Sequence, residues 1–115
     1  MAEQNLILDL TFKFSMDSII FSELLESNRK FNMAKQYWRS STGIGALVRE
    51  SQGAESKADF RHKLKIAYKE AEESEYWLLL CKHSVSYPTD ENLLEQVLVI
   101  KKVLGKIIAS TKKEG

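Results

Sequence analysis

The residues from Met33 to Leu80 read MAKQYWRSSTGIGALVRESQGAESKADFRHKLKIAYKEAEESEYWLLL, and this stretch decides the fold. Its first part is rich in small residues from Ser40 to Ala46. A polar break follows from Glu50 to Ser56, and then a long charged segment ends in aromatic residues and leucines. The pattern predicts two helices joined by a turn, a hairpin against which both ends of the chain pack.

The first helix of this hairpin is expected over about Phe31 to Ser51. Its apolar stripe has helical spacing and consists of Ala34, Tyr37 or Trp38, Ser41, Ile44 and Val48. Gly43 and Gly45 each lower helix propensity by ~1 kcal/mol relative to alanine. The two glycines therefore indicate either the close approach of another helix or a kink near Gly43.

The second helix of the hairpin is expected from Ser56, its N-cap, with Asp59 reaching back, to about Ser84. One stripe forms a heptad-like seam for antiparallel packing: Phe60, Leu64, Ala67, Ala71, Ser74, Leu78 and Cys81. A second apolar set lies off that seam: Ile66, Tyr68, Trp77, Leu79 and Leu80. Because a monomeric bundle needs only one buried stripe, we predict that this second set forms an interface with another subunit.

The two ends of the chain supply the remaining elements. Apolar residues alternate with other residues from Leu6 to Phe14, which favours a short extended N-terminal arm before Thr11. A helix is expected from about Thr11, as N-cap, to Glu26; its apolar residues are Phe12, Met16, Ile19, Ile20, Leu24 and Leu25. After Pro88, Thr89 is expected to cap a fourth helix. The predicted fold is all-α, an up-down-up-down antiparallel four-helix bundle forming a single domain over residues 1–115.

Composition narrows the function classes. The formal net charge is +1, so there is no general electrostatic case for binding nucleic acid or a membrane. Cys81 is the single cysteine, which excludes an intrachain disulfide and suits a reducing cytoplasm. The N-terminus lacks the pattern of a signal peptide, and no window approaches the ~20 apolar residues of a membrane span. We therefore expect a cytoplasmic protein with no membrane partner.

The side chains that carry chemistry are few. His62 follows Asp59 by three residues, but His83 has Leu80 at that offset, so the sequence lacks the paired motifs of a bundle metal centre. Cys81 falls on the packing seam, where a free cysteine usually acts as a small apolar residue. We expect no metal, no cofactor, no small-molecule substrate and no enzymatic activity. A close contact between Cys81 and either histidine in an open pocket would reopen the question.

The run from Arg39 to Leu80 also carries a family resemblance. Its first part has Arg39, Ser40, Thr42, Ile44, Gly45, Ala46, Val48, Arg49 and Glu50. The later parts have Ala54, Glu55, Ser56, Asp59 and Phe60, and then Ile66, Ala67, Lys69, Glu70, Ala71, Tyr76, Trp77 and Leu78. These residues closely resemble the bacterial four-helix bundle proteins related to those encoded in 23S ribosomal RNA intervening sequences. Gly43 and Leu47 depart from the family pattern, which usually has serine and asparagine there.

The resemblance implies a homo-oligomer, a pentameric ring of bundles, without catalytic activity. A related group, the accessory variability determinant proteins of diversity-generating retroelements, is similar in fold and binds nucleic acid and a reverse transcriptase. Cations do gather on the hairpin of this chain: Arg39, Arg49, Lys57, Arg61, Lys63, Lys65 and Lys69. Interleaved acids are typical of solvated pairs on a monomer, whereas a ring would repeat the cations around one rim.

The leading hypothesis is a non-enzymatic oligomeric scaffold or RNA-associated accessory protein, with structured RNA or a nucleic-acid enzyme as its partner. The candidate phosphate contacts are Arg39, Arg49, Lys57 and Lys65. The alternative is an adaptor that recruits another protein and binds no nucleic acid.

Overall fold

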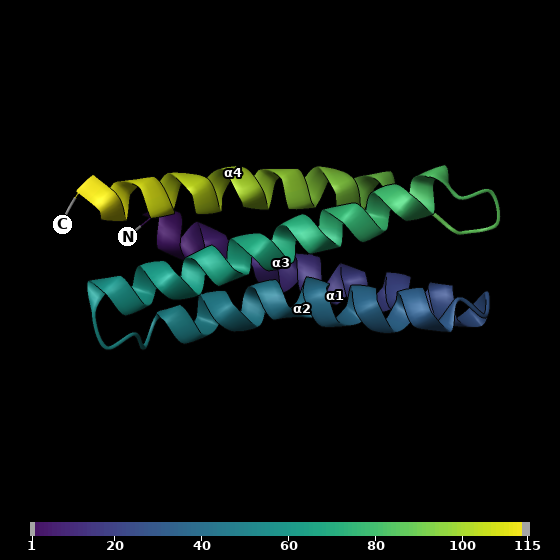
Figure 1. Cartoon of the computed structure of the whole chain (residues 1–115), viewed down its shortest axis with the longest axis horizontal. Helices are drawn as coiled ribbons and strands as arrows, with labels where there is room; N and C mark the ends of the chain where they lie inside the picture. Colours follow the sequence, from purple (N-terminus) through teal and green to yellow (C-terminus); the bar gives the residue numbers. More distant parts are fainter. Residues whose placement is uncertain (1, 114–115) are drawn as a thin grey trace.

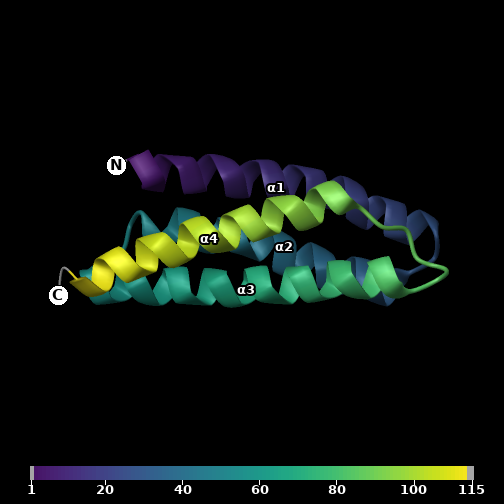
Figure 2. The same ribbon diagram turned by 90° about the horizontal axis from the view of Figure 1, so that it is seen from above.

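A computed structural model describes residues 2–113, with side chains described over residues 5–112. The chain forms α1 (Ala2–Ser27), α2 (Phe31–Ser51), α3 (Lys57–His83) and α4 (Glu91–Lys113). Each helix packs against the helices before and after it in the chain, and α1 also packs against α4. The helices run along one axis of a body measuring 48 × 20 × 19 Å, and α1 begins where α4 ends (Figure 1). The predicted up-down-up-down bundle is therefore confirmed, and a view from above shows the same arrangement (Figure 2).

The hairpin α2–α3 is the most accurately predicted part. Both helices have the expected bounds to within a residue or so, and α2 continues through Gly43 and Gly45 as one α-helix. Ser56 is the N-cap of α3, and its hydroxyl accepts from the backbone N–H of Asp59 at 3.0 Å. The Asp59 carboxylate in turn accepts from the backbone N–H of Glu55 at 3.1 Å. These two bonds satisfy donors that a helix start leaves free.

The prediction of an extended N-terminal arm was wrong, because α1 is helical from Ala2. Thr11 is an interior residue of α1 and not its N-cap; its side chain is buried and donates to the carbonyl of Ile7 at 2.7 Å. The alternation of apolar residues from Leu6 to Phe14 resembled a strand because α1 carries apolar residues on more than one face. Ile7 and Phe14, which lie on the buried face with Thr11, follow a helical spacing that the alternating residues obscure.

The cap of α4 is also one residue later than predicted. Asp90, and not Thr89, precedes the helix, and its carboxylate accepts from the backbone N–H of Leu93 at 3.0 Å. A carboxylate at this place is favoured twice, by the hydrogen bond and by the positive end of the helix dipole.

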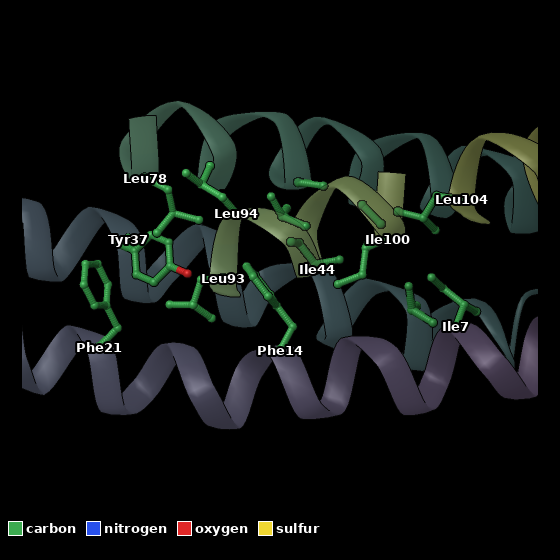
Figure 3. Close-up of a cluster of buried hydrophobic side chains, with 14 of the residues drawn as sticks. Ile7, Phe14, Phe21, Tyr37, Ile44, Leu78, Leu93, Leu94, Ile100 and Leu104 are labelled. Atoms are coloured by element: carbon green, nitrogen blue, oxygen red, sulfur yellow. The ribbon is translucent and has the colours of Figure 1, made fainter. Parts of the chain in front are cut away.

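The core runs the length of the bundle between the four helices (Figure 3). Tyr37 of α2 and Phe21 of α1 meet edge to face, with ring centroids 5.5 Å apart. The Tyr37 hydroxyl shares a 2.7 Å hydrogen bond with Ser18 of α1, which satisfies both buried groups. Between α2 and α3, Ser40 and Ser74 share a buried hydrogen bond of 2.8 Å. Tyr37, rather than Trp38, is thus the aromatic residue of the α2 core stripe.

Candidate interaction surfaces

Large apolar side chains lie exposed along the outside of α1 and the adjoining edge of α2. Phe12 and Ile20 are each 65% exposed, Met16 is 51% exposed, and on α2 Phe31 is 59% and Trp38 is 50% exposed. We call these five residues the α1–α2 apolar surface. Isolated exposed apolar residues are ordinary, but a group of this size on neighbouring turns is typical of a surface that contacts another molecule.

A groove follows the seam between the same two helices. One part of the groove has a volume of about 470 Å³ and is lined by Phe12, Met16 and Trp38 among others. A second part, also about 470 Å³, continues past Trp38 to Phe31. Ile19 and Trp38 line both parts, so the two hollows adjoin each other along the seam. Concave apolar surfaces of this kind accept side chains from a partner more readily than a convex surface does.

Two contacts between α1 and α2 set how α1 is turned about its axis. Ser18 must face the core to reach the Tyr37 hydroxyl. Gly45 lies so close to α1 that a Cβ there would be 3.2 Å from Ser15 Oγ and 3.4 Å from the carbonyl oxygen of Thr11. With Ser18 and Thr11 inside, Phe12, Met16, Ile20 and Leu24 of the predicted α1 stripe lie outside. These four apolar residues indicated a helix by their spacing, but they do not face the core.

The predicted off-seam set on α3 is less exposed than the α1–α2 apolar surface. Ile66, Tyr68, Trp77 and Leu80 are half-buried, and Leu79 is 37% exposed. Trp77 packs against the core and its indole N–H donates to Glu73 at 3.3 Å. Part of the apolar area of these residues is therefore already buried within the bundle. Sequence reasoning missed the more exposed residues on α1, although an excess of apolar residues around that helix was visible.

The four candidate phosphate contacts fall in three places. Arg39 lies on α2 and forms ion pairs with Glu70 and Glu73 of α3. Arg49 lines the α1–α2 groove. Lys57 and Lys65 lie on α3, both exposed and eight residues apart. The structure thus brings Lys57 and Lys65 to one helix face and leaves the two arginines elsewhere.

Two further cations belong to the same row on α3. Arg61 lies midway between Lys57 and Lys65, and Lys69 follows Lys65 by four residues. The four cations are therefore four residues apart and lie along one side of the helix. Arg61 is held in place, because its guanidinium donates to the hydroxyl and carbonyl oxygens of Thr111 at 3.1 and 3.0 Å. Lys57, Lys65 and Lys69 form no ion pair with another described residue. We call these four residues the α3 cationic row.

The two departures from the family pattern have different surroundings. A Cβ at Gly43 would lie 3.6 Å from the side chain of Glu70, which is an ordinary contact, so a serine would fit there beside the Arg39 ion pair. Leu47 is half-buried and packs against the core. The leucine adds apolar contact where the family usually has a polar amide.

The side chains considered for catalysis are separated. Cys81 is buried in the core, and burial raises the pKa of its thiol to about 11. His62 and His83 are exposed. Among residues 5–112 no cluster of three or more histidine, cysteine and acidic side chains is arranged to hold a metal ion. Over the same part of the chain, no helix has the length and hydropathy to cross a membrane.

Fold and surfaces together describe an all-helical four-helix bundle, with the α1–α2 groove on one side and the α3 cationic row on another. Comparison with known proteins identifies the family: the model of the 23S rRNA-intervening sequence proteins matches residues 3–108, and the chain belongs to that family. A crystal structure of an S23 ribosomal protein family member from Bacteroides thetaiotaomicron VPI-5482, itself described as of unknown function, is similar to this chain. The two share 37% identity with a TM-score of 0.87, over 93% of this chain and 98% of that one. No curated protein matches.

Proposed function

We propose that the protein is a non-enzymatic scaffold that assembles with copies of itself through the α1–α2 apolar surface and associates with structured RNA in the cytoplasm. The observation that carries the proposal is the group of five large apolar side chains, each at least half exposed, beside two adjoining hollows of the α1–α2 groove. Water contact with such a surface is unfavourable, and a second copy offers the apolar area that covers it. A pentameric ring is the assembly that the family resemblance implies.

Polar groups also lie beside this surface. Ser22 lines the second part of the groove, and its hydroxyl is buried without a hydrogen-bond partner among the described residues. Exposed carboxylates, Glu23 and Glu26, lie beside it on the same groove. A neighbouring copy that placed donors opposite these carboxylates would give the contact a defined register.

Self-association is tested by light scattering on the purified chain over a range of concentrations. The expected result is a defined oligomer several times heavier than the 13.2 kDa chain. A monomer at every concentration would refute the assembly part of the proposal.

The α3 cationic row supports the RNA part of the proposal. Its lysines are exposed and unpaired, and assembly into a ring would bring several copies of the row together. The test is a filter-binding titration with a structured RNA at several salt concentrations. Affinity is expected to fall as salt rises, because phosphate contacts release bound counterions. If the affinity does not change with salt concentration, or if no RNA binds, the RNA part of the proposal is refuted.

A protein adaptor is the second candidate function. The observations that favour it are the net charge of +1 and the use of Arg39 in ion pairs within the bundle, both of which weaken the attraction for phosphate. Affinity purification from the native host distinguishes the two. An adaptor would retain a protein partner after nuclease treatment, and an RNA-associated scaffold would lose its partners.

A further inference from the structure

Gly105 lies in the interior of α4, where glycine is unfavourable for a helix. Close packing does not explain it. A Cβ at this position would have Tyr68 Cε2 of α3 as its nearest neighbour, at 4.0 Å, which is an ordinary contact. Gly45 is the contrasting case, because there the neighbouring helix leaves little space. At Gly105 the missing side chain instead leaves a groove open between α3 and α4, with a volume of about 360 Å³.

The groove combines an apolar floor with a charged rim. Tyr68, Gly105 and Ile108 supply the floor, while Lys65, Lys69 and Glu72 supply the charges. The two lysines belong to the α3 cationic row and form no ion pair with a described residue.

A neighbouring cation lies over the ring of Tyr68. The Lys101 ammonium lies 5.6 Å from the centroid of the Tyr68 ring. Lys101 is itself fixed by an ion pair of 2.8 Å with Glu75. A cation that is itself held by an ion pair thus contacts the same ring that lines the groove.

We propose that this groove binds one unpaired nucleotide of an RNA loop, with the base against Tyr68 and the flanking phosphates on Lys65 and Lys69. Proteins recognise unpaired RNA by stacking bases on aromatic side chains while cations follow the backbone. Successive members of the α3 cationic row are about 6 Å apart along the helix, so a strand leaving the groove meets Arg61 and Lys57 in turn. Glu72 at the rim can accept a hydrogen bond from an amino or imino group of the base. The inference rests on the RNA association proposed above.

The test measures binding of a labelled stem-loop RNA by fluorescence anisotropy. Gly105→Leu fills the groove without changing any charge, and we expect it to weaken binding by about 10-fold or more, the effect of losing one stacked base. Ser110→Leu, at an exposed position about 140° around the same helix from Gly105, is the control and should bind as the unmodified chain does. Gly105→Ala replaces glycine with a better helix former, so its melting temperature should equal or exceed that of the unmodified chain while its affinity falls.

The lysines give an independent readout. Lys65→Gln combined with Lys69→Gln should lower the slope of log affinity against log salt by about 1.4, since each phosphate contact to a single strand contributes about 0.7. A duplex of the same sequence without a loop should bind more weakly than the stem-loop. If the unmodified chain binds no RNA, both the RNA association and the groove assignment fail. If it binds but Gly105→Leu binds equally well, or the duplex competes equally, the groove assignment alone is overturned.

Discussion

Replacing Phe12 with glutamine tests whether the α1–α2 apolar surface joins copies of the chain. Glutamine is a good helix former, so the change removes an aromatic side chain without disturbing α1. Phe12 is 65% exposed, and a phenylalanine side chain that buries about 200 Å² would therefore hide about 130 Å² more in a contact. At about 25 cal/mol per Å², that area corresponds to about 3 kcal/mol for each contact that contains it.

A loss of this size lowers the association constant of each contact by a factor of about 100. Sedimentation velocity at a series of concentrations should show the dissociation midpoint of Phe12→Gln shifted upward accordingly. The melting temperature of the dissociated chain should stay nearly constant, because the side chain contributes little to the monomer core. Val85→Gln is the control, since Val85 is fully exposed in the loop between α3 and α4.

The outcome that would refute this reasoning is an oligomer whose midpoint is the same for Phe12→Gln and the unmodified chain. The surface joining the copies would then lie elsewhere. The half-buried residues on α3 would become the next candidates.

Four further changes test the fold. Trp77→Ala should lower the free energy of unfolding by about 2–3 kcal/mol, measured by urea denaturation, or reduce the oligomeric state, because the indole packs against the core. Arg29→Gly should raise stability by about 0.5–1 kcal/mol, seen as a higher melting temperature, since Arg29 has a φ of 64° in the turn between α1 and α2. Gly45→Leu should cost about 2 kcal/mol or more in the same melt, because Ser15 of α1 leaves no room. Cys81 should resist Ellman's reagent at pH 8. Because burial raises the pKa of its folded-state thiol to about 11, the unfolded chain loses this proton first as pH rises. Stability should therefore fall more steeply from about pH 9 to 11 than it does in Cys81→Ala, which keeps only the decline from other groups such as Tyr37, whose pKa burial also raises.

The hairpin α2–α3 could be predicted closely because its signals are local. The cap at Ser56 needs only Asp59, three residues later, and the seam on α3 follows from spacing within one helix. The cationic row is also a local pattern, since residues four apart share a helix face. Arg39 was harder to place, because its partners Glu70 and Glu73 are more than thirty positions away and become neighbours only when α2 packs on α3.

What the sequence by itself determined is that four amphipathic helices form a bundle, and which family the hairpin resembles. The rotation of α1 was decided by tertiary structure. Apolar residues surround this helix, so burying Phe14 and burying Phe12 are both plausible from its own pattern. The choice depends on α2, where the Tyr37 hydroxyl needs Ser18 in the core and Gly45 admits the α1 backbone. Those contacts bury Phe14 and place Phe12 outside, and so create the α1–α2 apolar surface.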